Sequence, residues 1–527
     1  MAERTIPSNA EPERVSSMRT VRKEYLCLFS FLLLWFCLNL LFLARYPQLH
    51  SDEAWLGGLT RNMLAQGSLR VTEPFFDLKP RFPHAIKILF HLLQMPLIAV
   101  FGYSVYALRL LSLIFGALSL YMVYRSLREA AQFPFALSLT AALSVNGQFI
   151  QAAHTARQEC ILLFVLLWCV WILLKNGEQI TIRTAIRLAV LTGLSAGLHP
   201  NSFLIALGCG FAMLFIMLTQ RNFAWKPLLA YIGVTGGIAL LFVGISLWFD
   251  GGFISHWLSY GDTEFELRVP VLDKLGGLLS YLSRLWSGVS GTYILPELRP
   301  QLLLWAGLFL GSSIYAIVKK SASAAAVLGM ALGAVLGTAL IGRYNQLSAI
   351  LWMFPCLLLP GIIPWRRIWM KRIIPAVLAV LFALAAAGPI VRAYSSDYDA
   401  YIQKISASVS ENTKTLANLN TGFYFDNDAL LDVRNLSFLQ DNDMSFAEYV
   451  ESRGIGAIVW SDEMNFIYDH RPDFNVLYGN PRIVPEAEAF FREHCILVAT
   501  FEEIGYGMRL VQLIGEPCMV RIYRVNP

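Results

Sequence analysis

Two adjacent carboxylates, Asp52 and Glu53, follow closely on the first long apolar run of this chain. A carboxylate in such a place can take the proton of an attacking hydroxyl group, as a general base does. The pair can also simply begin a helix, because apolar residues continue at helical spacing through 53–64, with Ser51 or Asp52 available as the N-cap. The residue types therefore fit a catalytic role and a capping role.

A second cluster of charged side chains follows in the same loop. The stretch 77–84 contains Asp77, Lys79, Arg81 and His84, and its two prolines predict a stiff, extended segment. Acid, base and imidazole in one short segment are more than a helix start needs. The presence of this second charged cluster in the same loop favours a functional interpretation of Asp52 and Glu53.

More candidates stand at the ends of later apolar runs and in the long loop 250–300: Arg157, Glu159, Arg343, His256, Asp262 and Glu264. Charged groups inside a bilayer cost ~2.5–3.5 kcal/mol each on insertion scales, so Arg157 and Glu159 need a polar cavity or each other. Arg157 and Arg343 also have a structural interpretation, as partners of Glu159 or of backbone carbonyls.

A divalent metal is a further option. Asp77 and His256 are hard or borderline ligands, as are several carboxylates of the same loops. No ligand spacing defines a site, and histidines at membrane interfaces also serve as polar anchors. The metal question stays open on the sequence.

The elements that carry these residues belong to a polytopic membrane protein. Of 527 residues, 56% are hydrophobic and 15% charged, and the mean hydropathy is +0.53. Apolar windows long enough to cross ~30 Å of hydrocarbon predict about eleven spans. They are 25–44, 105–124, 133–151, 159–175, 184–199, 202–219, 227–249, 301–318, 322–341, 345–363 and 373–391. The formal net charge of +5 comes with no basic stripe, so no nucleic-acid partner is expected.

The segment 85–101 decides the orientation. It carries Lys87, His91, Gln94 and Pro96, which make it a poor spanning helix. If it lies in the interface, the basic clusters of the later loops fall on the side of the basic N-terminus; if it crosses, they all change side. The positive-inside rule favours the first arrangement. We therefore expect a cytoplasmic N-terminus and the candidate residues at the outer surface.

Three units follow from this division: a cytoplasmic tail 1–24, a transmembrane domain 25–392, and an extracytoplasmic domain 393–527 of ordinary soluble composition. In the last, the pattern predicts helices at 397–416 and 446–453 and strands at 422–425, 457–460 and 520–525, which is typical of a small α/β or α+β domain. Six cysteines lie in apolar runs. A disulfide between Cys495 and Cys518 is left open.

The order of these motifs resembles the GT-C superfamily of membrane glycosyltransferases. The likeness is to the bacterial branch related to protein O-mannosyltransferases and the lipid A aminoarabinose transferase, and it covers roughly residues 25–392. It rests on the acidic pair, the Lys79-Pro80 platform, and the stretches 102–112, 156–159, 193–200 and 343–355. One departure is that Leu78 separates Asp77 from Lys79-Pro80, where relatives usually have the acid directly before the lysine.

The resemblance implies sugar transfer from a polyprenyl-phosphate donor to a lipid, glycan or protein acceptor at the outer leaflet, with inversion. It gives Asp52 the catalytic role, with Glu53 as its partner, in a bacterial inner membrane. A departing phosphate needs cations, and the acceptor needs polar contacts. Lys79, Arg81, Arg157 and Arg343 are the expected phosphate-binding residues, and His84, Glu159, His256, Asp262 and Glu264 the expected substrate or acceptor residues.

Two other classes compete with a transferase. A transporter or flippase for a lipid-linked sugar would show internal repeats and polar residues through the midplane. A sugar-polymer polymerase or ligase would place its largest outer loop late in the membrane domain. Here the polar residues gather on one side, and the candidate loop follows the first span.

Overall fold

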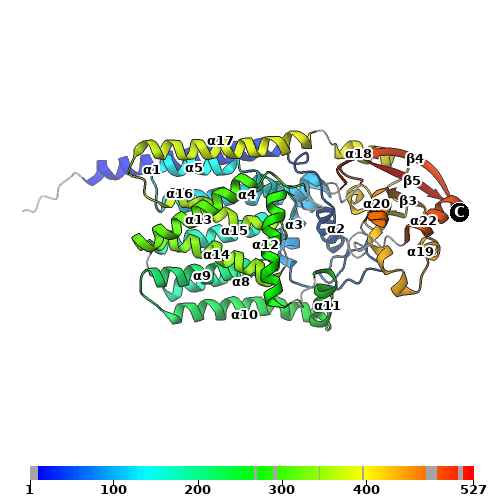
Figure 1. Cartoon of the computed structure of the whole chain (residues 1–527), viewed down its shortest axis with the longest axis horizontal. Coiled ribbons are helices and arrows are strands. Elements are labelled where there is room, and N and C mark those ends of the chain that lie inside the picture. Colours follow the sequence, from blue (N-terminus) through cyan, green and yellow to red (C-terminus); the bar gives the residue numbers. More distant parts are fainter. Residues whose placement is uncertain are drawn as a thin grey trace, which may run out of the picture.

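The computed structural model describes residues 10–177, 179–265, 270–288, 294–342, 345–394, 397–470, 483–507 and 514–526. Long helices lie side by side in a bundle, and the C-terminal sheet domain sits at one end of it (Figure 1). The short helices α2, α3 and α11 lie at that same end, between the bundle and the sheet domain.

Eight described helices are long and apolar enough to cross a bilayer. They are α1 (Ala10–Leu40), α4 (Val105–Arg128), α7 (Glu159–Asn176), α9 (Ser202–Thr219), α10 (Trp225–Phe249), α13 (Arg299–Lys319), α14 (Ala322–Ile341) and α17 (Ile368–Ala393). The protein is thus a multi-pass membrane protein, as the composition predicts. α1 begins at Ala10, well before the expected start of the first span at residue 25.

The other three predicted spans are shorter or broken. The segment 133–151 is two helices, α5 (Phe133–Ser144) and α6 (Gly147–His154), bent by 68°. α8 (Ile182–Ser195) has only 14 residues. The segment 347–362 is a fully buried run of short helical pieces, η1 (Leu347–Ala349), α15 (Ile350–Met353), η2 (Phe354–Leu358) and α16 (Leu359–Ile362). Hydropathy alone cannot separate such core segments from lipid-facing spans, because both are apolar.

The ambiguous segment forms α3 (Ile88–Phe101), whose 14 residues extend about 21 Å and so fall short of the hydrocarbon thickness. α12 (Val271–Ser287) runs across the long helices in Figure 1. The loop after α1 contributes α2 (Ser51–Gln66), and the loop after α10 contributes α11 (Phe253–Phe265). Helices too short or too polar to span thus occupy the end of the bundle beside the sheet domain.

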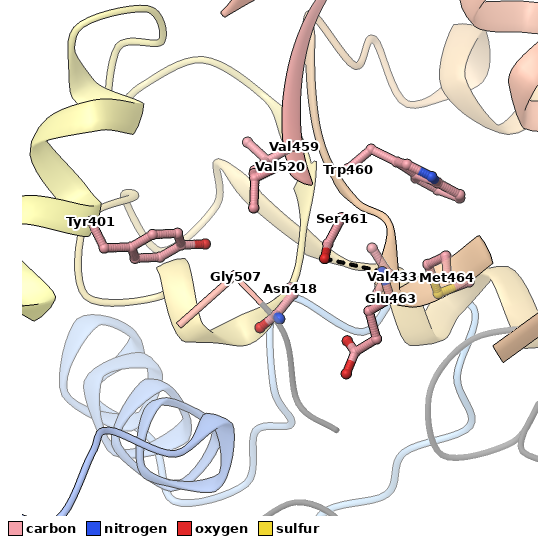
Figure 2. A pocket seen from close by; sticks show the side chains of 10 residues that line it. All are labelled: Tyr401, Asn418, Val433, Val459, Trp460, Ser461, Glu463, Met464, Gly507 and Val520. Atoms are coloured by element: carbon pink, nitrogen blue, oxygen red, sulfur yellow. Dashed lines mark hydrogen bonds between the residues drawn. The ribbon is translucent and has the colours of Figure 1, made fainter. Parts of the chain in front are cut away.

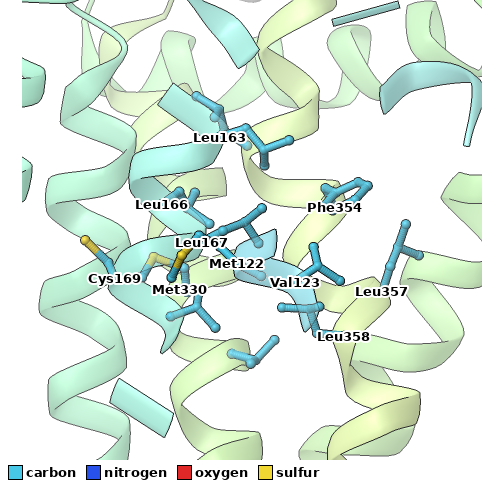
Figure 3. Packing of buried hydrophobic residues seen from close by; sticks show 14 of the residues in the cluster. Met122, Val123, Leu163, Leu166, Leu167, Cys169, Met330, Phe354, Leu357 and Leu358 are labelled. Carbon is cyan, nitrogen blue, oxygen red and sulfur yellow. The ribbon is translucent and has the colours of Figure 1, made fainter. Parts of the chain in front are cut away.

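The core of the bundle is a cluster of buried aliphatic and aromatic side chains from α4, α7, α14 and η2. Leu163, Leu166 and Leu167 of α7 face Phe354 and Leu357 of η2 (Figure 3). Where α9 and α14 cross, small residues replace these large ones. A Cβ added at Gly329 would lie 2.6 Å from the backbone of α9, so the two helices touch backbone to backbone there.

The C-terminal domain is a five-stranded mixed sheet with strand order β2-β1-β3-β5-β4. β1 pairs in parallel with β2 and β3, and β5 pairs antiparallel with β3 and β4. The strands are β1 (Thr415–Ala417), β2 (Leu430–Asp432), β3 (Ala457–Ser461), β4 (Cys495–Glu503) and β5 (Cys518–Val525). The helices are α18 (Tyr398–Ser406), η3 (Leu419–Thr421), η4 (Val433–Phe438), η5 (Gln440–Asn442), α19 (Phe446–Ser452), α20 (Glu463–His470) and α22 (Val484–His494).

Two sequence predictions for this domain are wrong. The helix predicted at 397–416 ends at Ser406, and residues 415–417 belong to strand β1. The segment 422–425 is a turn that follows η3 and forms no strand; its aromatic side chains pack on neighbouring elements instead.

The structure also answers the question of a disulfide that the sequence left open. Cys495 and Cys518 do not pair, because β4 and β5 place Cys495 opposite Val525 and Cys518 opposite Glu503. The two thiols therefore stand at opposite ends of the same strand pair.

The close crossing of α9 and α14 gives a test of the core. Gly329→Ala should lower the thermal unfolding midpoint, because the backbone of α9 cannot yield and overpacking costs about 1–3 kcal/mol. The matched control is Gly307→Ala in α13, whose added Cβ meets no atom within 4 Å. Tryptophan-fluorescence melting in detergent should show a loss for the first variant only. Equal midpoints for the two variants would contradict the close crossing.

Candidate functional site

The acidic pair lies in the first turn of α2, but neither residue is its N-cap. His50 takes that position: its Nδ1 accepts from the backbone N–H of Asp52 at 3.1 Å, and the Glu53 carboxylate accepts from the N–H of His50 at 3.1 Å. This reciprocal capping box satisfies the helix start. The side chain of Asp52 is therefore not needed as a cap.

Glu53 is fully buried and forms a two-pronged ion pair with Arg109 of α4. The Nε and Nη2 atoms of Arg109 donate to the two carboxylate oxygens at 2.7 Å each, and Ala156 N–H donates at 2.8 Å. Arg109 Nη1 donates to the carbonyls of Leu43 and Pro47. These bonds join the end of the first span, α2, α4 and the segment after α6. Glu53 is thus placed to hold the neighbouring Asp52 rather than to touch a substrate.

Asp52 instead pairs with Arg157, whose Nη1 donates to its Oδ2. The same guanidinium donates to Glu159 from Nη2 at 2.9 Å and from Nε at 3.2 and 3.3 Å. Arg157 therefore bridges two carboxylates from opposite sides. The structure brings three of the predicted site residues together, although they come from two separate segments.

Exposure distinguishes the clustered acids. The Asp52 side chain keeps 26% of its surface accessible, whereas Glu53 and Glu159 keep 1% and 4%. Glu73, in the loop that follows α2, keeps 4%. Of these four carboxylates, only Asp52 is open to an incoming molecule.

Three cations surround the indole ring of Trp55, one turn further along α2. Lys79 Nζ lies 5.3 Å from the ring centroid, and the guanidinium carbons of Arg81 and Arg434 lie at 5.2 and 4.5 Å. Two acids balance part of this charge: Glu73 binds Arg81 at 2.7 and 2.9 Å, and Asp432 binds Arg434 at 2.6 Å. These three cations are named here the Trp55 cation cluster.

Glu73 is ionised although it is buried. Burial would raise the pKa of this carboxyl, but the charge of Arg81 and the hydrogen bonds from Arg81 and Trp55 together lower it to about 2. Burial would likewise lower the pKa of Arg81, but Glu73 and Tyr260 together raise it. Both groups stay charged at neutral pH, so the charges of this ion pair do not change in the physiological pH range.

The predicted histidines meet where the loop that carries His84 packs against α11, which carries His256. The ring of Phe82 packs against His84 and His256, with centroids 5.7 and 5.6 Å apart, and His84 meets Trp257 at 5.3 Å. His256 Nδ1 lies 2.7 Å from the Asp250 carboxylate. Burial, with the charges of Lys87 and Arg81 nearby, lowers the pKa of His84 to about 3. His84 is thus a neutral imidazole.

Asp77 points away from these groups and binds the C-terminal domain. It accepts from the hydroxyl of Tyr449 at 2.9 Å and from Nε of Arg453. In the described part of the chain, no three His, Cys, Asp or Glu side chains form a group that could hold a metal ion. A metal-ligand role for Asp77 and His256 therefore gains no support from the geometry.

Three predicted residues lie outside what the structure describes. Arg343 falls in an undescribed stretch, and the side chains of Asp262 and Glu264 are not described either.

Sequence reasoning missed Arg109, Glu73, Trp55 and Arg434. A charge within the apolar run 105–124 was the available signal for Arg109. The other three carried no such signal, because they come together only through the packing of the loop on the C-terminal domain.

Two cavities lie within the C-terminal domain, away from these charges. One of about 20 Å³ is lined by residues such as Tyr401, Asn418 and Glu463, and the N–H of Glu463 donates to Ser461 Oγ (Figure 2). It has room for about one water molecule. The other is an open groove of about 520 Å³ between α20, α22 and β5. Both are lined by residues of this domain alone.

A multi-pass helical bundle with a mixed sheet domain at the end that carries its charged loops defines a recognisable class of membrane protein. No protein-family model and no curated protein matches the sequence. Solved structures do. The archaeal oligosaccharyltransferase AglB from Archaeoglobus fulgidus, in complex with an inhibitory peptide and a dolichol-phosphate, aligns with a TM-score of 0.50 and 15% identity, over 91% of this chain and 73% of its own.

The apo form of the A. fulgidus oligosaccharyltransferase aligns with a TM-score of 0.50 and 14% identity, over 86% of this chain and 72% of its own. ArnT from Cupriavidus metallidurans, bound to undecaprenyl phosphate, aligns with a TM-score of 0.45 and 14% identity, over 94% and 97% of the two chains. At such identities the AglB likeness establishes the fold. The chain has the GT-C fold, which confirms the fold expected from the order of its motifs.

The ion pair of Glu53 and Arg109 gives a stability prediction. Glu53→Gln leaves a buried guanidinium without its charge partner, which costs about 3–5 kcal/mol. We expect a markedly lower melting temperature in detergent. The double variant Glu53→Gln/Arg109→Met should recover part of this loss, since it removes the uncompensated charge. Strict additivity of the two single changes would show that the pair does not act as a unit.

His84 gives a pH prediction. The unfolded chain takes up a proton here near pH 6.5, whereas the folded protein does so only near pH 3. Because the unfolded state binds more protons between these values, folding stability falls as pH drops through this window. His84→Gln should therefore shrink the loss of melting temperature between about pH 7.5 and about pH 5. The control His494→Gln, at a half-exposed histidine, should leave that loss unchanged. An undiminished loss in His84→Gln would contradict the assignment.

Proposed function

We propose that this protein is an integral membrane glycosyltransferase that moves a sugar from a polyprenyl-phosphate donor to an acceptor at the outer face of the membrane, with inversion. The observation that carries the proposal is the accessible carboxylate of Asp52 near three buried cations that gather around Trp55. The GT-C fold supports it, as does the dolichol-phosphate in the AglB complex of that fold.

In this proposal the Trp55 cation cluster binds the donor phosphate. Departure of a polyprenyl phosphate leaves negative charge on its oxygens, and cations fixed in a low-dielectric site stabilise that charge strongly. Arg81 is held in place by Glu73, and the ammonium group of the buried Lys79 lies against the same indole ring. Arg343 remains a candidate for the same role.

Asp52 acts on the acceptor. Its carboxylate accepts the proton of the incoming hydroxyl group while the sugar–phosphate bond breaks on the opposite face. Arg157 fixes the orientation of Asp52, and Glu159 fixes Arg157, so both act as positioning residues. Glu53 positions the same turn through Arg109.

The remaining expectations from the sequence fit this scheme. In this proposal the N-terminus is cytoplasmic and the C-terminal domain extracytoplasmic, in a bacterial inner membrane. The start of α1 and the C-terminal domain lie at opposite ends of the bundle (Figure 1), which supports their location on different sides of the membrane. His84 and His256 pack on the ring of Phe82, next to Arg81 in the sequence, and in this proposal they contact the acceptor.

Asp52→Asn tests the proposal. The substitution keeps the size of the side chain but removes its basicity, so sugar transfer should fall by about 10²–10⁴-fold. Transfer is measured with radiolabelled polyprenyl-phosphate monosaccharides in membranes that contain the purified protein. Asp426→Asn is the matched control, because Asp426 also belongs to a surface ion pair, with Arg61 of α2. Full activity in a folded Asp52→Asn variant would overturn the assignment of the base.

A further inference from the structure

The segment 73–81, which carries Lys79 and Arg81, lies along a short strip of the C-terminal domain at the end of β2 and the start of η4. Asp432 N–H donates to the carbonyl of Phe75 at 3.1 Å, and the side chain of Asn435 donates to the same carbonyl at 3.0 Å. Asn435 Oδ1 accepts in turn from the N–H groups of Leu78 and Lys79, at 3.3 and 3.2 Å. One amide side chain therefore bonds the loop backbone at three points.

The strip itself is rigid. Asn435 is completely buried. The Asp432 carboxylate accepts from the N–H of Leu419 at 3.0 Å and from the N–H of Arg434 at 2.9 Å, which fixes the turn from β2 into η4. Because Asn435 is buried on this fixed turn, its amide group can hold the backbone of the segment 73–81 in one conformation.

The loop has little structure of its own. Residues 67–87 contain no helix or strand, so their backbone groups need partners from elsewhere. Contacts with the C-terminal domain continue on both sides of Asn435: Arg434 stacks on Phe76 at 4.9 Å, and Tyr449 and Arg453 bind Asp77. The C-terminal domain thus supplies the bonds that a sheet or helix would otherwise supply.

We propose that Asn435 is a positioning residue of the donor site: it fixes the backbone at Leu78 and Lys79 and so places the Lys79 ammonium group in the Trp55 cation cluster. The C-terminal domain then contributes to donor affinity by holding the segment 73–81 in place, in addition to any role in choosing the acceptor. This inference rests on the proposed function, in which Lys79 binds the donor phosphate.

The test compares Asn435→Ala with Asn465→Ala. Asn465 is a matched control in the same domain, because its side chain donates to Glu488 at 2.7 Å and lines the open groove between α20, α22 and β5. Hydrogen exchange of the full-length protein in detergent should show faster exchange in the peptide that contains Leu78 and Lys79 for Asn435→Ala, with the strands β3 and β5 unchanged. Asn465→Ala should leave that peptide protected.

Two functional measurements complete the test. Binding of a long-chain polyprenyl phosphate, without sugar, should weaken roughly tenfold in Asn435→Ala, the size expected when buried hydrogen bonds are lost at a binding loop. The KM for the lipid-linked sugar should rise by a similar factor while kcat changes little, since Asp52 and Arg157 are untouched.

The outcomes separate the two proposals. If the wild-type protein does not bind polyprenyl phosphate, the proposed function fails. If it binds, but Asn435→Ala binds equally well or leaves the exchange of residues 78–79 unchanged, the positioning role of Asn435 is overturned. A variant with a raised KM, faster exchange in this loop and a normal melting temperature supports it.

Discussion

The buried pair of Glu53 and Arg109 is the interaction on which the site depends. Arg109 is a full charge at the start of a span, and it is tolerated because every donor group finds an oxygen: two from Glu53 and two backbone carbonyls. The pair fixes the first turn of α2 against the second span and against the segment that follows α6. Asp52 and Arg157 meet because this arrangement brings their two backbones together. The position of the accessible Asp52 thus depends on a fully buried ion pair.

The C-terminal domain completes the charged site from the other side. Arg434 and Asn435 belong to that domain by sequence, yet they contact Trp55 and the loop of the membrane domain. Conversely, Asp77 belongs to the loop of the membrane domain but binds Tyr449 of the C-terminal domain. The two domains therefore share one site at their junction, and neither builds the cation cluster alone.

The sequence predicts the parts of this structure that depend on local pattern. Hydropathy finds the long helices, and charges beside apolar runs find Asp52, Arg157 and Lys79. It overestimates the spans, since the buried segment 347–362 is as apolar as a lipid-facing helix. It also misplaces a strand at 422–425, where Phe423 stacks on Tyr103 at 5.0 Å. Contacts such as that between Asn435 and Lys79 join residues 356 positions apart, and one sequence contains no pattern for them.

The burial of the Trp55 cation cluster has a consequence for salt. Mobile ions screen charges that face water, with a Debye length of about 8 Å at physiological ionic strength, but they penetrate little into a buried group. Lys79 and Arg434 are almost wholly enclosed. In the proposed function, an anionic headgroup bound among them would be held by short-range, desolvated contacts. Its affinity would respond weakly to ionic strength, unlike that of the basic surface patches by which many peripheral proteins bind anionic lipids.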